Sequence, residues 1–189
     1  YTLGGADAAL FMIDGNTIRL KDGVALDYEQ AATRSFDLTI SDGTNSIARS
    51  LTVAVADVNE APTITSAASF SIAENGSAVA TMTSTDPDAG ATKSWSISGT
   101  DASLFQIDAQ TGALSFRTAP DHEHAQDSGA DNVYDLTVSI SDGTNTASKA
   151  VAVTVANAND APVITSAATA QTIEQTTGVA TLAATDQDG

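Results

Sequence analysis

Cysteine is absent from the 189 residues, and tryptophan occurs once. Without cysteine there are no disulfide bonds or thiolate metal sites. Cysteine usage therefore does not indicate whether the protein works in an oxidising or a reducing compartment. Basic side chains are also scarce, because 7 Lys and Arg accompany 24 Asp and Glu, for a formal net charge of −17. That surplus argues against nucleic acid and anionic lipid surfaces as partners. The apolar runs are too short to span a bilayer, so we expect no direct membrane insertion. Clustered carboxylates would instead attract a divalent cation.

The chain repeats itself with a period of 100 residues. Segment 41–45, SDGTN, recurs letter for letter at 141–145, and the linker DVNEAP at 57–62 has its counterpart NANDAP at 157–162. A period this long indicates whole domains rather than small solenoid units. We predict the C-terminal part of one repeat at 1–62, a complete repeat at 63–162 and the N-terminal part of a third at 163–189.

Apolar side chains alternate with polar ones in the manner of strands. Phe36, Leu38 and Ile40 alternate in one copy, and the same pattern returns at 134–140 and 151–155. An Asp-Gly pair separates the two alternating runs in each copy, which is typical of a hairpin turn. About seven short strands per period, without a helical stripe, predict an all-β chain of tandem immunoglobulin-like β-sandwiches.

The two ends of the sequence fall in the same loop of successive repeats. Tyr1 aligns with Trp95, and Gly189 aligns with Ala89 or Gly90. One interpretation is an arbitrary boundary within a flexible loop. The alternative is that the halves of identical chains complement each other head to tail, forming an open filament. A monodisperse monomer in calcium would rule against the second interpretation.

Acidic motifs recur in phase with the linkers. DYE at 27–29 returns as DHE at 121–123, and DPD at 86–88 returns as DQD at 186–188. Alternate spacing places two oxygens on one side of an extended backbone. Calcium takes six to eight oxygen ligands, including carboxylates and backbone carbonyls. Because all of these motifs recur together at each junction, we expect Ca²⁺ sites rather than solvated turns.

The order of these motifs resembles tandem cadherin repeats. The motifs are I-x-E-N at 72–75, then D-x-D, F-x-I-D-x-x-T-G, D-x-E, S-D-G and D-x-N-(D/E)-x-P. The style is similar to the cadherin-like repeats in the extender regions of large bacterial biofilm adhesins, including those of RTX type. The resemblance implies an extracellular, non-enzymatic chain whose linkers bind Ca²⁺.

Carried over by position, the resemblance implies two calcium clusters. The first would use Asp27, Glu29, Asp57, the Val58 carbonyl, Asn59, Glu60, Asp86, Asp88 and Asp142. The second would use Glu74, Asp121, Glu123, Asn157, the Ala158 carbonyl, Asn159, Asp160, Asp186 and Asp188. Asn157 stands where the family has an aspartate, which removes one negative charge. Ala61 and Ala161 replace the second linker asparagine. The expected occupancy is one to three ions per junction.

The expected function is that of a calcium-rigidified structural or adhesive spacer of a large extracellular surface protein or filament. Without metal the crowded carboxylates repel, so adjacent repeats should swing, and cations should stiffen them. Its expected partners are neighbouring repeats of the same or an identical chain, together with a glycan or cell-surface ligand.

Two other functions compete with the spacer. A glycosidase could use the carboxylates of Asp121 and Glu123, but the first copy has Tyr28 where the second has His122, and catalytic residues are not interchangeable in that way. We therefore expect no enzyme. A calcium-dependent carbohydrate-binding module is the stronger alternative, since sandwich modules bind glycans through exposed aromatic rings.

Overall fold

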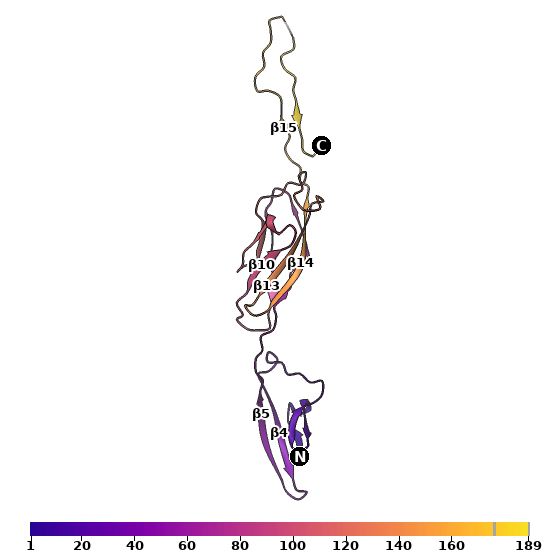
Figure 1. Cartoon of the computed structure of the whole chain (residues 1–189), viewed down its shortest axis with the longest axis vertical. Coiled ribbons are helices and arrows are strands. Elements are labelled where there is room, and N and C mark those ends of the chain that lie inside the picture. The colour runs from indigo at the N-terminus through magenta and orange to yellow at the C-terminus, as the bar shows by residue number, and fades with distance from the viewer. Residues whose placement is uncertain (176, 189) are drawn as a thin grey trace. The chain divides into compact units, whose positions relative to one another are not determined.

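The computed structural model describes residues 1–175 and 177–188, and its regular structure is almost entirely β-strand (Figure 1). The chain divides into two compact units. Unit 1 comprises Tyr1–Glu60 with Pro87–Gly90, and unit 2 comprises Ala61–Asp86 with Ala91–Gly189. No helix in the described ranges has the length and apolar character needed to cross a bilayer.

Unit 2 contains two main sheets. The larger has the order β10-β13-β14-β7, in which β7 joins β14 in parallel and the other pairs are antiparallel. Its strands are β10 (Ser94–Ser98), β13 (Val133–Ser141), β14 (Thr146–Ala156) and β7 (Ser69–Ala73). The smaller sheet has the order β11-β12-β8, with β11 (Phe105–Ile107), β12 (Ala113–Phe116) and β8 (Ala78–Thr81). A short ladder pairs β6 (Thr63–Ile64) with β9 (Ser84–Thr85).

The core of unit 2 is made by the alternating residues of its long hairpin. Tyr134, Leu136, Val138 and Ile140 of β13 are at most 3% exposed, as are Val151, Val153 and Val155 of β14. Because successive side chains of a strand point to opposite faces, this alternation covers one face of the sheet with apolar groups. The rings of Phe105 and Phe116 contact each other and the ring of Tyr134 in this core. The predicted all-β sandwich is confirmed.

The turn of that hairpin follows the predicted Asp-Gly chemistry. Oδ1 of Asp142 accepts the backbone N–H groups of Thr144 and Asn145, both at 2.6 Å. Gly143 has φ +99°, in the left-handed region that favours glycine. Asp42 and Gly43 make the same turn in unit 1, where Oδ1 of Asp42 accepts the N–H groups two and three residues on.

Unit 1 has fewer strands in its sheets than unit 2. One sheet has the order β1-β4-β5, and β2 pairs only with β3. The strands are β1 (Thr2–Gly4), β2 (Phe11–Asp14), β3 (Thr17–Leu20), β4 (Thr33–Ser41) and β5 (Ser46–Ala54). Phe11 and Phe36 are buried, with ring centroids 4.5 Å apart, and they form its small core.

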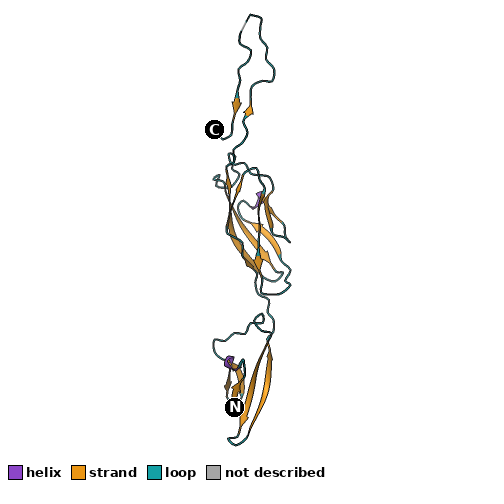
Figure 2. Cartoon of the chain, turned by 180° about the vertical axis from the view of Figure 1, so that it is seen from behind, coloured by secondary structure: helices purple, strands orange, loops and turns teal. Residues whose placement is uncertain are grey.

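Two smaller features complete the fold. Single turns of 3₁₀-helix, η1 (Ala8–Leu10) and η2 (Ala102–Leu104), precede β2 and β11 (Figure 2). After Ala161, the described residues form β15 (Val163–Ile164) and β16 (Ala184–Thr185), which pair with each other, and the rest is loop.

Candidate metal centre

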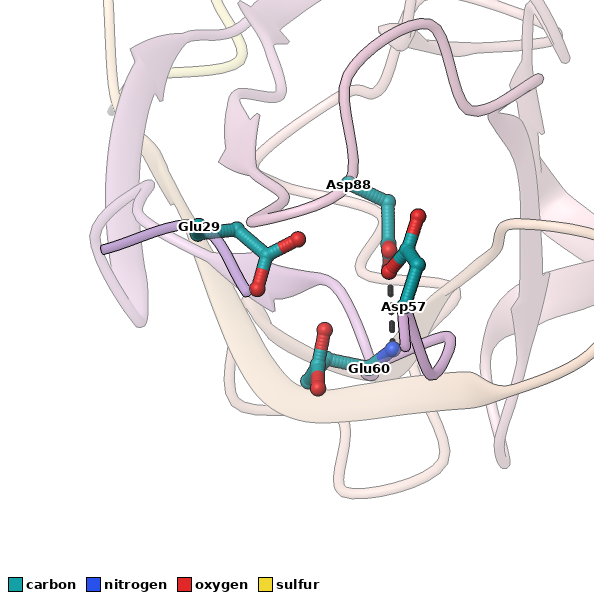
Figure 3. Close-up of side chains that lie close together, drawn as sticks. All are labelled: Glu29, Asp57, Glu60 and Asp88. Carbon is teal, nitrogen blue, oxygen red and sulfur yellow. Dashed lines mark hydrogen bonds between the residues drawn. The ribbon is translucent and has the colours of Figure 1, made fainter. Parts of the chain in front are cut away.

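Four carboxylates converge within unit 1. One oxygen each of Glu29, Asp57, Glu60 and Asp88 lies within 4.8 Å of the others (Figure 3). Glu29 lies in the loop before β4, Asp57 and Glu60 follow β5, and Asp88 belongs to the segment 87–90. The backbone N–H of Glu60 donates to Oδ2 of Asp88 at 2.8 Å, which holds that segment against the linker.

The electrostatics of this cluster are unfavourable without a cation. The pKa of Glu60 is raised above its ordinary value, first by partial desolvation and then by the negative charges of Glu29, Asp88, Asp57 and Asp27. Like charges disfavour ionisation of a neighbouring carboxyl group. A cation within reach of these oxygens would relieve that repulsion.

A second carboxylate cluster lies in unit 2. One oxygen each of Glu74, Glu123 and Asp160 lies within 4.8 Å of the others. The backbone N–H of Asp160 donates to Oδ2 of Asp188 at 2.5 Å. It is equivalent to the bond from Glu60 to Asp88, with residue numbers shifted by 100. Both linkers therefore contain the same backbone-to-carboxylate hydrogen bond.

Glu74 is the buried member of the second cluster. It is 3% exposed, and its two oxygens accept the backbone N–H groups of His122 at 2.6 Å and Ala158 at 2.7 Å. Its own N–H donates to Ala156. These bonds satisfy the desolvated carboxylate and fix its position at the end of β7.

The structure brings together part of each predicted ligand set. Seven predicted residues lie in the two clusters, and Asn157 adjoins the second, because its Nδ2 donates to Oε1 of Glu123 at 2.8 Å. Asp186 accepts the N–H of Asp188. The side chains of Asn59 and Asn159 donate to the carbonyls of Glu60 and Asp160.

Other predicted ligands lie outside both clusters. Oδ1 of Asp27 accepts the N–H of Gln30, and Oδ1 of Asp121 accepts that of His124, so both carboxylates cap their own turns. Asp86 and Asp142 belong to unit 2, whereas the first cluster belongs to unit 1. For the carbonyls of Val58 and Ala158 a ligand role stays a prediction.

Two side chains near the second cluster were not among the predicted ligands. Nδ2 of Asn75 and Nε2 of Gln187 both approach Asp160, at 3.2 and 3.4 Å. The I-x-E-N motif was the available signal for Asn75. For Gln187 no repeat signal existed, because the equivalent position holds Pro87.

Comparisons with known proteins agree with this arrangement. Residues 68–156 match the family model for the cadherin domain. Protocadherin Fat 4 of Mus musculus is 34% identical over 175 residues, which are 86% of this chain and 3% of that protein. Protocadherin-16 of Homo sapiens is 33% identical over 135 residues, 67% of this chain and 4% of that protein. The chain carries cadherin repeats.

The fold of the chain is also similar to solved structures of cadherin repeats. The solved structure of protocadherin gamma B7 extracellular cadherin domains 1–4 superimposes with a TM-score of 0.63 at 23% identity, covering 98% of this chain and 49% of that one. At this identity the match shows the fold alone. Cadherin ectodomain repeats are extracellular, belong to a non-enzymatic family and typically bind Ca²⁺ at their linkers.

The donor sets of both clusters fit a calcium ion. Every donor in the two clusters is a carboxylate oxygen, and calcium prefers hard oxygen ligands. Oε2 of Glu123 is buried without a hydrogen-bond partner, although its other oxygen is bonded to Asn157. An unsatisfied buried acceptor is costly, and a bound cation would satisfy it.

Proposed function

We propose that the chain is a calcium-rigidified spacer of a large extracellular surface protein, with Ca²⁺ held at the linker of each repeat. The observation that carries this proposal is a hydrogen bond that recurs at two clusters of crowded carboxylates. The backbone N–H of Glu60 donates to Asp88, and that of Asp160 donates to Asp188. The chain spans only 3–4% of the length of the curated relatives it matches. The spacer role of the longer parent protein is therefore also part of this proposal.

The proposed ligands are the residues that the two clusters contain. Glu29, Asp57, Glu60 and Asp88 would hold an ion at the first linker. Glu74, Glu123 and Asp160 would hold one at the second, with Asp188 adjoining through Asp160. The ion would supply positive charge that neutralises these side chains and fixes the linker backbone. The remaining predicted ligands stay predictions.

The repeat boundaries and the parent protein belong to the same proposal. We propose repeats at 1–62, 63–162 and 163–189, the middle one complete. We also propose an origin in bacterial biofilm adhesins, on the ground of the plain linkers with Ala61 and Ala161. The proposed partners are neighbouring repeats of the same or an identical chain.

The carbohydrate-binding alternative receives little support from the aromatic side chains. Phe11, Phe36, Trp95, Phe105, Phe116 and Tyr134 are buried, and Phe70 is half-buried. Among the described aromatic rings, Tyr1 and Tyr28 are the exposed ones. Two scattered rings do not make a stacking platform for a sugar.

Small-angle X-ray scattering in calcium and in EDTA tests the spacer function. With calcium we expect a narrow distribution of interatomic distances, and without it a broader one, since crowded carboxylates repel. Magnesium should substitute poorly, because it demands a tight octahedral shell and dehydrates reluctantly. Identical scattering curves in calcium and EDTA would refute a calcium-stiffened spacer.

A further inference from the structure

The turn between β7 and β8 contains the only asparagine-glycine pair of the sequence, Asn75-Gly76. Both residues are exposed. Every other asparagine of the sequence precedes a residue that has a Cβ atom. Glycine places no side chain beside the preceding amide and leaves the backbone free to turn. The backbone nitrogen of Gly76 can therefore approach the side-chain carbonyl carbon of Asn75 more easily than at any other asparagine, which is the approach that deamidation needs.

Neither space nor backbone conformation requires a glycine at position 76. A Cβ on Gly76 would meet the Ala73 carbonyl at 3.5 Å, an ordinary van der Waals contact, and the φ of Gly76 lies outside the left-handed region. Among the described residues, no hydrogen bond uses the backbone N–H of Gly76. The nitrogen that would attack is therefore not held in place by a hydrogen bond.

Asn75 lies at the edge of the second carboxylate cluster. Its Nδ2 donates to Oδ1 of Asp160 at 3.2 Å, and Asp160 belongs to that cluster together with Glu74 and Glu123. Glu74 immediately precedes Asn75, whose backbone N–H donates to the Pro120 carbonyl at 3.0 Å. A new charge on the side chain at position 75 would therefore act directly on the second cluster.

We propose that Asn75-Gly76 is a site of spontaneous deamidation, which adds a negative charge to the second cluster. The backbone nitrogen of Gly76 forms a bond to Cγ of Asn75. The bond from Cγ to Nδ2 then breaks, and ammonia leaves with the proton that the Gly76 nitrogen has lost. The product is a five-membered succinimide ring, in which this nitrogen is joined to both carbonyl carbons of residue 75.

Water opens the succinimide ring. Attack at Cγ breaks the new bond and leaves an aspartate, whereas attack at the backbone carbonyl carbon leaves an isoaspartate, in which the chain continues through Cγ. The sum of the steps consumes one water, releases one ammonia and needs neither an oxidant nor a reductant. Either product carries a carboxylate that is ionised at neutral pH.

The added carboxylate changes the contacts of the second cluster. An oxygen would replace the Nδ2 that now donates to Oδ1 of Asp160, and two carboxylate oxygens at that separation repel each other. The isoaspartate form also adds one methylene to the backbone beside Glu74, whose carboxylate accepts the N–H groups of His122 and Ala158. Both products should therefore loosen the second cluster in the absence of a cation.

A link to calcium rests on the proposed function, although the deamidation itself does not. An ion held by Glu74 and Asp160 would restrain the turn on both sides of Asn75. Attack by Gly76 needs local opening of this turn, and ligands that stabilise a segment make such openings rarer. Calcium should therefore slow the reaction, and the modification should accumulate when calcium is removed.

Incubation of the full chain at neutral pH in EDTA and in calcium, followed by peptide mass mapping, measures the reaction at each asparagine. In EDTA we expect Asn75 to deamidate at least about tenfold faster than Asn16 and Asn45, which are also exposed but precede Thr17 and Ser46. Calcium should lower the rate at Asn75. Labelling with an isoaspartyl methyltransferase measures the isoaspartate product.

Two variants separate the chemistry from its effect on the cluster. Gly76→Ala should deamidate about tenfold more slowly and melt at a temperature no lower than the parent chain, because a Cβ fits there. Asn75→Asp reproduces the aspartate product, and aspartate tolerates the φ of +63° at this position. It should melt at a lower temperature than the parent chain in EDTA, and equal melting temperatures would contradict the effect on the cluster.

The rates decide between the possible outcomes. Deamidation of Asn75 that is no faster than that of Asn16 and Asn45, or a Gly76→Ala variant that reacts at the parent rate, would overturn the proposal. Faster reaction at Asn75 that is equal in calcium and EDTA would support the modification site and count against calcium at the second cluster. Failure of this proposal is thus distinguishable from failure of the spacer function.

Discussion

Oε1 of Glu74 accepts the backbone N–H of Ala158 at 2.7 Å, although 84 residues separate them in the sequence. Its Oε2 accepts the N–H of His122 at 2.6 Å. One buried carboxylate therefore joins the end of β7, the loop at 121–124 and the linker after β14. These two hydrogen bonds should contribute to the stability of unit 2 in their own right.

Replacing Glu74 by glutamine should destabilise unit 2 in the absence of calcium. A glutamine side chain has one acceptor oxygen, so its NH₂ group would face one of the two backbone N–H groups. We expect a loss of about 1.5–3 kcal/mol in the free energy of unfolding, as for hydrogen bonds to charged groups. Urea unfolding in EDTA measures it. Glu174→Gln is the control, because Glu174 is exposed; equal losses would contradict the role of Glu74.

Glu29→Gln and Glu123→Gln should each weaken calcium binding at one linker. Calcium affinity depends on the number of charged ligands, and losing one carboxylate should reduce it about tenfold, or by about 1.4 kcal/mol. Calorimetric titration of each variant should show one weakened class of sites beside one unchanged class. Asp131→Asn removes an exposed charge outside both clusters. If it weakens binding as much as the others, the clusters are wrongly assigned.

Asp127 should make the stability of unit 2 depend on acid pH. Burial raises the pKa of Asp127, but the N–H groups of Asp131 and Asn132, at 3.1 and 3.0 Å, hold the pKa below its ordinary value overall. A lowered folded-state pKa stabilises the fold above the unfolded-state pKa, and this stability is lost as pH falls through the folded-state pKa.

The variant Asp127→Asn measures that contribution. At neutral pH we expect it to unfold about 1–2 kcal/mol more easily than the parent chain. The difference should shrink as pH falls below the unfolded-state pKa of aspartate, about 4, because the unfolded chain then binds a proton that the folded carboxylate binds only at lower pH. Urea unfolding across this pH range in EDTA gives both values. A difference that is constant with pH would show that the charge of Asp127 is irrelevant.

Gly112 should tolerate alanine less well than Gly143. Both glycines have positive φ, +72° and +99°. A Cβ on Gly112 would lie 2.8 Å from the Met82 carbonyl and 2.9 Å from Nε1 of Trp95, whereas one on Gly143 would meet nothing within 4 Å. Gly143→Ala isolates the conformational cost of about 1–3 kcal/mol, and Gly112→Ala should add about 1–3 kcal/mol of overpacking. Equal melting temperatures for the two variants would contradict this packing.

The strands and hairpins could be predicted because their information is local. Alternation in β13 and the Asp-Gly turn after it are each read from fewer than ten neighbouring residues. The same alternation could not predict exposure, since Ile40 and Ile140 share one pattern but differ from 42% to 0% exposed. Burial depends on which other strands cover the sheet, and that is non-local.

The candidate site was predicted only in part for a similar reason. The recurrence of D-x-E predicted both acidic residues of each motif as ligands. The structure brings Glu29 and Glu123 into the clusters, whereas Asp27 and Asp121 accept backbone N–H groups of their own turns. Outside both clusters, the buried carboxylate of Asp101 was not predicted either. It is 5% exposed and accepts the N–H groups of Ser128 and Asp135, and a bond across 34 residues has no sequence spacing to reveal it.

Calorimetric titration of the chain with calcium, combined with thermal melting before and after EDTA, tests the central claim most directly. We predict saturable binding, with dissociation constants of roughly 10⁻⁴–10⁻³ M as for extracellular modules. The melting temperature should rise, because calcium at about 100 times the dissociation constant adds about 2.7 kcal/mol per site to the folded state. Absence of binding, with the same melting temperature in calcium and EDTA, would reduce both clusters to solvated turns and contradict the account.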